Sequence, residues 1–440
     1  MIIIFFLTIM KPFRLLPILL LACGMTACSN NDDVTEQQLP AGQPAVDVPG
    51  NDVVSDSVFQ LNAAQQARVA PLNDFSVRLF RQLSSGQGST VVSPLSVAFV
   101  LGMINDGAQG ETQQEILNAL GFQGDDAQTV NELMKKFING APKADGKVTV
   151  AMANNVTLNR DYQLNPDYAQ SMKSYYDASV YSLDFSKPEA LQTINGWCSA
   201  KTHALIPAIL DKVNPEAVAY LLNAIYFKAE WTDKFSKDDT YGDAFITNAS
   251  TPDFSTIEMM HKTAKALYCE SEGMKALNLP FGGGRYSMTF LLPESVGGLD
   301  ALKSQLSGKT VQELKFTEQE VEMALPVFAT EADTDLIPLL KELGVSKMFS
   351  LDAELKGIAQ YQNGKDTPLY VSVMKQKTRL GVDEEGCEGA AVTKAELMET
   401  SNIPDDQPQP KTFLATHPFV YAVTEQATGA VVFMGQFCGE

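Results

Sequence analysis

The chain has 440 residues, of which 45% are hydrophobic, so it is long enough to bury a large core. Its formal net charge is -20 at pH 7. This charge argues against nucleic acid as a partner, because binding to phosphates requires clustered lysines and arginines. The acidity otherwise indicates high solubility.

The first 28 residues combine a basic start, an apolar run and small residues before a cysteine. The apolar run from Leu15 to Cys23 is too short, and too interrupted by proline, for a stable membrane span. The sequence Met-Thr-Ala-Cys28 resembles a bacterial lipobox, in which the cysteine is lipidated and becomes the mature first residue. Leu-Leu-Ala-Cys23 is the alternative site, but the polar, acidic residues after Cys28 resemble a surface-export signal.

Residues 1–28 are therefore predicted to be a lipoprotein signal peptide, with lipid on Cys28 that anchors the protein to the outer membrane, facing outward. A secretory peptide that is cleaved without lipidation is the alternative. Residues 29–57 are rich in Pro, Gly, Asp and Gln, which predicts a flexible tether. Residues 58–440 contain no internal repeat and no second linker, so they are predicted to form one domain.

The folded part begins with helical patterns. Apolar residues recur at helical spacing over residues 61–83. Ser93 is placed to cap a helix that has Pro94 at its first position, and a shorter helix is predicted to end at Gly121. Strands are predicted over residues 148–158, 219–227, 286–292, 321–327 and 420–433, the last interrupted by the turn Gln-Ala-Thr-Gly. The run Gly282-Gly-Gly284 is expected to be a hairpin turn, and the mixture predicts an α+β fold.

Residues that would indicate an enzyme or a metal site are sparse. No histidine lies in an HExxH motif, and no Gly-x-Ser-x-Gly elbow is present. Ser307-Gly-Lys-Thr resembles the end of a phosphate loop, but Lys303 stands where that loop needs glycine. No catalytic residue, metal or cofactor is therefore predicted, and four cysteines without metal-ligand spacing are expected to be mostly thiols: Cys198, Cys269, Cys387 and Cys438. The three histidines are expected to be structural: His203, His261 and His417.

The segment from Asp383 to Thr393 reads Asp-Glu-Glu-Gly-Cys-Glu-Gly-Ala-Ala-Val-Thr and continues into a polar, proline-rich stretch. Alternate positions are small or apolar, namely Cys387, Gly389, Ala391, Thr393, Ala395 and Leu397. A period of two favours a strand with one buried face. Gly and Ala are poor strand formers, however, and the polar continuation favours an exposed loop. The segment is thus suited to two states, a loop and later a strand.

Several motifs together resemble the serpin family, in the family's order, from about residue 61 to residue 437. They are Val91-Val-Ser-Pro-Leu-Ser-Val-Ala-Phe99, Gly107-Ala-Gln-Gly-Glu-Thr112, Leu222-Asn-Ala-Ile-Tyr-Phe-Lys228 with Trp231, Glu384-Glu-Gly-Cys-Glu-Gly-Ala-Ala391, His417-Pro-Phe-Val-Tyr421 and Val432-Phe-Met-Gly-Gln436. The resemblance implies a serpin fold of three β-sheets with about eight or nine helices and an exposed reactive loop at 384–411. It also implies a non-enzymatic, suicide-type inhibitor whose loop is cleaved by a serine or cysteine protease, forms an acyl-enzyme and inserts into the main sheet.

The resemblance also implies roles for individual residues. The hinge of the loop would comprise Glu384, Glu385, Gly386, Cys387, Glu388, Gly389, Ala390 and Ala391. The shutter beneath the sheet would comprise Ser93, Ser96, Asn223 and Gln376. The chain departs from the family's usual residues at Cys387, at Gly389 and at Gln376, where many members have a histidine that bonds to the residue corresponding to Asn223.

Counting from Glu384 by the family's usual spacing places the reactive bond between Thr400 and Ser401, with a register shifted toward Met398 as the alternative. Thr or Met at this position favours an elastase-like or subtilisin-like target protease, and a monomer is expected. Two other classes remain open. One is a non-inhibitory serpin that acts as a surface binding module. The other is a surface hydrolase or glycan-binding lipoprotein, which the missing histidine constellation and the absence of aromatic-rich repeats disfavour.

Overall fold

The computed structural model describes residues 59–86, 88–201, 204, 207–248, 253–271, 273–362, 369–387 and 409–439. The predicted signal peptide with Cys23 and Cys28, the tether, and His203 lie outside these residues. The same holds for the loop from Glu388 to residue 408, which includes the predicted reactive bond Thr400–Ser401.

The helical pattern of residues 61–83 forms two helices, α1 (Ala63–Gln66) and α2 (Val69–Leu83), where the sequence predicted one. The break has a local cause. The Arg68 guanidinium donates a hydrogen bond to the Ala64 carbonyl oxygen at 2.7 Å and forms an ion pair with Asp125. The Arg68 backbone N–H donates instead to the carbonyl oxygen of Gln65, three residues back. The side chain therefore competes with the backbone for a helical acceptor.

The helices that follow begin and end where local signals place them. Helix α3 (Pro94–Gly107) is capped by Ser93, whose hydroxyl accepts from Ser96 N at 3.4 Å. Helix α4 (Gly110–Leu120) ends at Gly121, which has φ of 77°. The other helices are α5 (Ala127–Gly140), α6 (Pro166–Tyr176), α7 (Pro188–Lys201), α8 (Leu299–Gln305), α9 (Gly308–Glu313) and α10 (Leu336–Glu342).

The described strands form three sheets, which confirms the predicted α+β class. A six-stranded sheet has the order β11 (Phe328–Asp335), β13 (Lys375–Val382), β14 (Gly386–Cys387), β5 (Ala219–Glu230), β2 (Val148–Asn159) and β4 (Ala178–Leu183). A nine-stranded sheet has the order β1 (Thr90–Val92), β17 (Ala430–Phe437), β16 (Phe419–Glu425), β9 (Tyr286–Pro293), β8 (Met274–Phe281), β7 (Asp253–Ser271), β10 (Thr317–Pro326) and β15 (Lys411–Leu414), with β6 (Thr240–Asn248) beside β7. A short pair joins β3 (Tyr162–Leu164) to β12 (Ala359–Tyr361).

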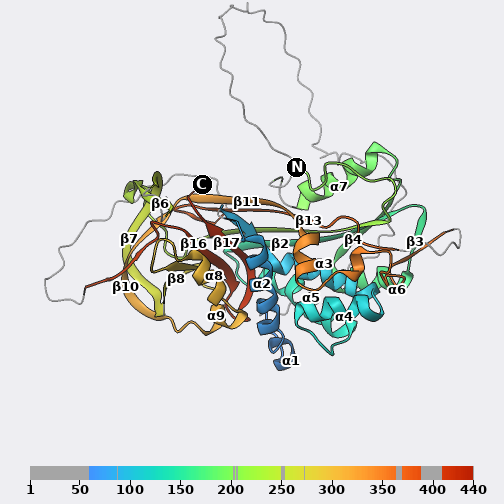
Figure 1. The fold of residues 1–440 in the computed structure, drawn as a ribbon, viewed down its shortest axis with the longest axis horizontal. Coiled ribbons are helices and arrows are strands. Elements are labelled where there is room, and N and C mark those ends of the chain that lie inside the picture. Colours follow the sequence, from blue (N-terminus) through green and yellow to red (C-terminus); the bar gives the residue numbers. More distant parts are fainter. Residues whose placement is uncertain are drawn as a thin grey trace, which may run out of the picture. The chain divides into compact units, whose positions relative to one another are not determined.

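Strand β5 separates two apolar clusters, because alternate side chains point to opposite faces of the sheet. Its residues Phe227 and Ala229 belong to the main core, which also contains the apolar residues of α3, β16 and β17. Its residues Tyr220, Leu222 and Ala224 pack instead against α7. Figure 1 shows α7 on one side of the six-stranded sheet, with α2 and α3 on the other. The six-stranded sheet is thus covered on both faces.

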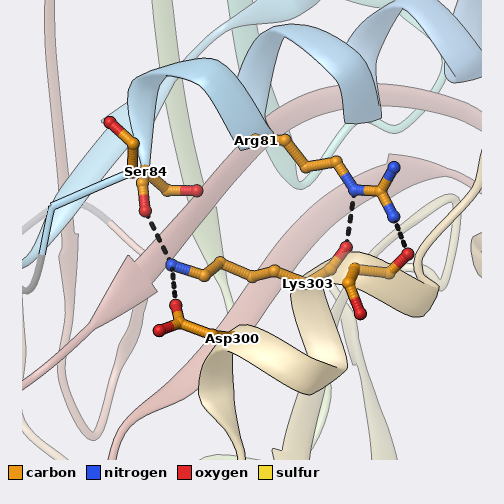
Figure 2. Close-up of a pocket in the computed structure, with 6 residues that line it drawn as sticks. Arg81, Ser84, Asp300 and Lys303 are labelled. Carbon is orange, nitrogen blue, oxygen red and sulfur yellow. Dashed lines mark hydrogen bonds and ion pairs between the residues drawn. The ribbon is translucent and has the colours of Figure 1, made fainter.

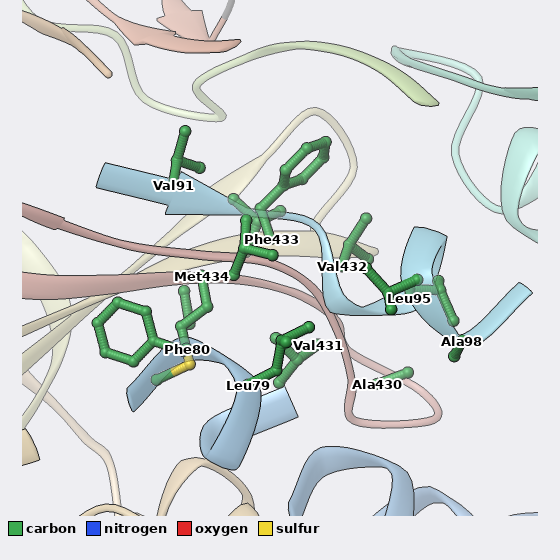
Figure 3. Packing of buried hydrophobic residues seen from close by; sticks show 14 of the residues in the cluster. Leu79, Phe80, Val91, Leu95, Ala98, Ala430, Val431, Val432, Phe433 and Met434 are labelled. Carbon is green, nitrogen blue, oxygen red and sulfur yellow. The ribbon is translucent and has the colours of Figure 1, made fainter. Parts of the chain in front are cut away.

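The main core packs closely around β17. Val431 to Phe433 lie between Leu79 and Phe80 of α2 on one side and Val91 and Leu95 on the other, as Figure 3 shows, and all are nearly inaccessible to solvent. Two motifs noted in the sequence have structural roles, and the first of them, the hairpin turn, was predicted. Gly282-Gly-Gly284 forms the turn between β8 and β9, and Ser307 caps α9 through a capping box with Thr310. Within the described residues, no helix combines the length and apolar character that a membrane span requires.

Candidate functional site

The first residues of the predicted hinge form a tight turn at the end of β13. The Asp383 carboxylate accepts hydrogen bonds from Glu385 N at 2.9 Å and from Gly386 N at 3.1 Å, and Asp383 N donates to Gly386 O at 3.0 Å. This arrangement is an Asx-type turn, which an aspartate favours. It reverses the chain so that Gly386 and Cys387 enter the sheet as β14.

The segment after β5 holds this turn in place. Trp231 donates its indole N–H to Asp383 O and its backbone N–H to Glu385 O, both at 2.8 Å, and Phe235 N donates to Glu384 O at 3.0 Å. Lys234 forms ion pairs with Glu385 at 2.7 Å and with Glu230 at 2.9 Å. The hydrogen bond to Glu385, followed by that to Glu230, raises the pKa of Lys234. Hinge residues 384–386 are therefore fastened to the end of β5.

Gly386 has no room for a side chain. Its φ is 156°, and a Cβ atom would lie 2.0 Å from the carbonyl oxygen of Ala229. This close approach allows β14 to pair with β5 through Gly386↔Glu230 and Cys387↔Ala229, and with β13 through Cys387↔Val382. Both pairings are antiparallel.

Cys387 is 2% exposed and lies in the main core, on the same face as Phe227 and Ala229 of β5. This is the face that the period-two pattern assigned to it. The remaining predicted hinge residues lie outside the described part of the chain: Glu388, Gly389, Ala390 and Ala391.

Beyond Cys387, β5 and β13 border an elongated strand position, which we call the slot. It lies between residues 219–228 of β5 and residues 375–381 of β13, and the described residues place no strand there. At Cys387 each strand is one spacing of about 4.8 Å from β14, so β5 and β13 are roughly 9.6 Å apart at this end of the slot. Leu221, Asn223 and Ile225 face the main core yet are only half-buried, whereas Phe227 and Ala229 are buried.

The register of β14 defines which residues would meet across the slot. Each step forward from Cys387 is one step back along both antiparallel borders. Residue 393 would then lie between Asn223 on β5 and Gln376 on β13. Residues 395 and 397 would lie opposite Leu221 and Ala219. The last two line an apolar hollow at the far end of the slot, together with residues from α3 and from the segment before β13.

The four predicted shutter residues lie together at the middle of the slot, but Gln376 does not make the bond that a histidine makes at this position in many members of the family. Gln376 does not bond to Asn223. It donates to Ser93 O at 2.9 Å and accepts from Ser93 N at 2.9 Å. Asn223 instead accepts from the Ser96 hydroxyl and donates to Asn154 at 2.8 Å. Gln376 therefore links β13 to the start of α3 through the backbone of Ser93.

The shutter has two further attachments. The Ser93 hydroxyl donates to Val432 O at 2.8 Å, which ties α3 to β17. Asn154 of β2 donates to Tyr176 O at 2.7 Å, which continues the network to the end of α6. Sequence reasoning missed Asn154, and it also missed Asp383 and Lys234 at the turn. An aspartate just before Glu-Glu-Gly is a turn signal that could have identified Asp383.

Other polar groups have structural explanations. His417 is 8% exposed, and its Nε2 lies 2.8 Å from Pro293 O, so it is packed as predicted. Burial lowers the pKa of His417. In the described part of the chain, the four cysteines are thiols and no group of His, Cys, Asp or Glu side chains is arranged to hold a metal ion.

A hollow of about 340 Å³ lies between α2 and α8 and contains Arg81 and Lys303 (Figure 2). The Lys303 ammonium donates to Ser84 O at 2.6 Å and to Gln436 Oε1 at 3.1 Å, and it pairs with Asp300 at 2.9 Å. These three partners use all of its donors. Arg81 binds the carbonyl oxygens of Lys303 and Ser304. The two cations therefore join α2, α8 and β17 rather than hold a ligand.

The comparisons with known proteins agree with this geometry. Residues 70–439 match the family model described as serpin (serine protease inhibitor). The leukocyte elastase inhibitor of Bos taurus is 31% identical over 378 residues, which cover 82% of this chain and 96% of that protein. The thermophilic serpin tengpin in its native state has a TM-score of 0.77 at 26% identity, over 86% of this chain and 95% of that one. A complex of thyroxine-binding globulin with thyroxine has a TM-score of 0.74 at 22% identity, over 84% and 99%, which shows the fold alone. The chain belongs to the serpin family.

Proposed function

We propose that this protein is a suicide-type protease inhibitor whose reactive loop, residues 384–411, inserts into the slot after cleavage. The observation that carries the proposal is the match between the slot and the loop sequence. In the continued register, the residues that would face the core are Gly389, Ala391, Thr393, Ala395 and Leu397, all small or apolar. Leu397 would meet the apolar hollow at the far end.

The energetics favour such an insertion. Among the described strands, only β14 lies between β5 and β13, so an inserted strand would gain backbone hydrogen bonds to both. At about 1 kcal/mol net for each bond, the sum is comparable with a typical domain stability of roughly 5–15 kcal/mol. The intact form would then be held by a kinetic barrier rather than by the lowest free energy.

The reactive bond is proposed to be Thr400–Ser401, with Met398 as the alternative position before the cut. A residue of small or medium size before the bond favours an elastase-like or subtilisin-like protease. The name of the leukocyte elastase inhibitor relative is consistent with this class of target. We propose in addition that the protein acts at the outer membrane, attached through lipid on Cys28 and the tether of residues 29–57.

The test uses the soluble domain from residue 58 with a panel of serine and cysteine proteases. Covalent complexes that survive boiling in detergent are expected with at least one elastase-like or subtilisin-like enzyme. Protein cleaved in the loop should melt at a higher temperature than intact protein, because the loop has become a strand. Cleavage without a complex and without a gain in melting temperature would contradict the proposal and favour a non-inhibitory binding module.

A further inference from the structure

Helices α3, α5 and α6 pack against one another and enclose a cluster of polar side chains (Figure 1). Asn131 of α5 is 1% exposed. Its amide nitrogen donates to the Asp106 carboxylate of α3, and its amide oxygen accepts from the Tyr176 hydroxyl of α6 at 2.8 Å. Tyr168 of α6 donates to Met103 O of α3 at 3.1 Å. We call the cluster of Asp106, Asn131, Tyr168 and Tyr176 the junction, since it joins the three helices.

Asp106 occupies a poor position for a negative charge. It lies in the last turn of α3, where the helix dipole presents its negative end, and that turn contains no basic residue. Burial raises the pKa of the Asp106 carboxyl group, and hydrogen bonds with Asn131 and Ser171 act in the opposite direction without cancelling the rise. The group therefore binds a proton more readily in the folded protein than in water.

The groups around Asp106 supply no compensating charge. Tyr168 and Tyr176 are the titratable groups that face it, and burial raises the pKa of both, so their hydroxyls stay neutral. Lys135 of α5 lies instead over the ring of Tyr175, 5.3 Å from its centre. Among the described residues, no charged side chain of α4, α5 or α6 acts on the pKa of Asp106, and none forms an ion pair with it.

The junction continues into the shutter through Tyr176. The backbone carbonyl of Tyr176 accepts from Asn154 at 2.7 Å, and the side chain of Asn154 accepts from Asn223 at 2.8 Å. Asn223 accepts in turn from the Ser96 hydroxyl. The bonds thus form a ring that leaves α3 at Asp106, passes through α5, α6, β2 and β5, and returns to α3 at Ser96.

We propose that Asp106 is a proton switch: with a proton bound it keeps this ring closed, and as a carboxylate it lets the ring open. An opened junction admits water to the carboxyl group, and hydration favours its charged form. Each unit by which the pKa falls on opening changes the opening equilibrium by about tenfold. Because the pKa is raised in the folded protein, the stabilising contribution of Asp106 is present at low pH and is lost as the pH rises through the folded pKa.

Opening of the ring also bears on the slot. In the register of β14, residue 393 would enter between Asn223 and Gln376, so the bonds of Asn223 must rearrange to admit it. Ionised Asp106 should therefore favour insertion, and protonated Asp106 should retain the intact form. This part of the inference rests on the proposed function, whereas the effect on stability does not.

The first measurement is thermal melting of the soluble domain between pH 5 and pH 8. Asp106→Asn keeps the shape of the side chain and stays neutral, so it imitates the protonated form. It should melt about 1–3 °C above the unmodified protein at pH 8, and this difference should shrink towards pH 5. Glu132→Gln is the matched control, because Glu132 is an exposed carboxylate beside Asn131 on α5, and it should follow the unmodified protein at every pH.

Ser171→Lys carries the test if Asp106→Asn fails to fold. Ser171 of α6 forms a hydrogen bond with the Asp106 carboxyl group, so a lysine there would supply the missing cation. The carboxylate would then be paired at neutral pH. This variant should also gain most over the unmodified protein at pH 8 and least at pH 5.

The second measurement follows insertion without a protease. A fluorescent, acetylated peptide with the sequence of residues 387–399 is mixed with the intact domain, and its uptake is followed by fluorescence anisotropy. The uptake rate of the unmodified protein, divided by that of Asp106→Asn, should rise at least about threefold from pH 5 to pH 8. The peptide is the same for both proteins, so titration of its own carboxylates cancels in this ratio.

The outcomes separate the two proposals. If neither Asp106→Asn nor Ser171→Lys gains melting temperature at pH 8, or if the gain does not shrink towards pH 5, the proton switch is wrong and the inhibitor proposal stands. A constant ratio of uptake rates beside the expected melting would overturn the coupling of the junction to the slot. If no protein takes up the peptide, insertion itself is wrong, and the melting comparison alone decides the switch.

Discussion

Gln376 and Ser93 bond to each other twice, since the side-chain amide of Gln376 donates to Ser93 O and accepts from Ser93 N, each at 2.9 Å. Gln376 lies on β13 at the border of the slot, and Ser93 caps the helix beneath it. A neutral side chain thus makes the connection between the sheet and α3. Its hydrogen bonds do not depend on protonation between pH 5 and 8, unlike those of a histidine.

Replacement of Gln376 by leucine should destabilise the intact protein. The change leaves the buried Ser93 N–H and carbonyl without these partners, which costs about 2–4 kcal/mol in the free energy of unfolding. The midpoint of urea unfolding should fall accordingly. Gln362→Leu is the control, because Gln362 is exposed and its side-chain amide donates to Arg160 O at 2.9 Å. Equal midpoints for the two variants would contradict a structural role for Gln376.

Gly386→Ala should release the start of the hinge from the sheet. A methyl group would conflict with Ala229 O, and the φ of 156° strains any other residue, at a cost of about 1–3 kcal/mol. Cys387 should then become accessible, so its thiol should react faster with an aromatic disulfide reagent. The control is Gly124→Ala, where φ is also positive, at 83°, but no atom lies within 4 Å of the added methyl group. A buried, unreactive Cys387 in the Gly386 variant would refute this expectation.

A charge should impair insertion on one face of the inserting strand and not on the other. Ala391→Arg places a guanidinium opposite Ile225 and Thr378, on the core face of the slot, where an unpaired charge costs several kcal/mol. Insertion should slow, and the variant should be consumed as a substrate. Ala390→Arg lies one residue earlier, beside the exposed Arg379, and should leave inhibition largely intact.

The measurement for this pair is the number of inhibitor molecules consumed for each protease inactivated. Similar numbers for Ala390→Arg and Ala391→Arg, or a larger defect at 390, would place the register one residue away from the one that β14 defines.

His417 should make the intact protein less stable in mild acid. Burial lowers its pKa in the folded protein, so the unfolded chain binds a proton more readily. The contribution of the neutral ring to the stability of the folded protein is present above the ordinary histidine pKa of about 6.5. This contribution is lost as the pH falls below that value. The decrease in melting temperature between pH 7.5 and 5.5 should therefore be smaller in His417→Gln. The half-buried His261, replaced in the same way, is the control, and an equal decrease in both variants would argue against this role.

Lipid on Cys28 should hold the full-length protein at the membrane. Stable anchoring requires two or more acyl chains, which a lipidated N-terminal cysteine provides. Cys28→Ala should move the protein to the soluble fraction or block its maturation, as judged by membrane fractionation and mass. If Cys23→Ala has this effect instead, the lipidation site is Cys23. Membrane retention of both variants would contradict the anchor.

Local signals made the helix boundaries predictable, whereas contacts between distant segments could not be predicted from the sequence. Ser93 followed by Pro94 identified the start of α3, and alternation assigned Cys387 to the buried face. The pairing of Cys387 with Ala229 joins segments far apart in the chain, so no local pattern could give its register. The partner of Gln376 could not be predicted for the same reason, because a long amide can reach several groups and packing selects among them. The break between α1 and α2 depends on how Arg68 divides its bonds between Ala64 and Asp125.

The short strand β14 has a kinetic consequence. Starting a new strand between two others is slow, because several residues must be ordered before many bonds form, whereas extending an existing end adds bonds with every residue. Gly386 and Cys387 are already paired on both sides in the intact protein. If the loop inserts as proposed, nucleation is complete before cleavage, and only propagation remains, in one direction and in the register that β14 already sets.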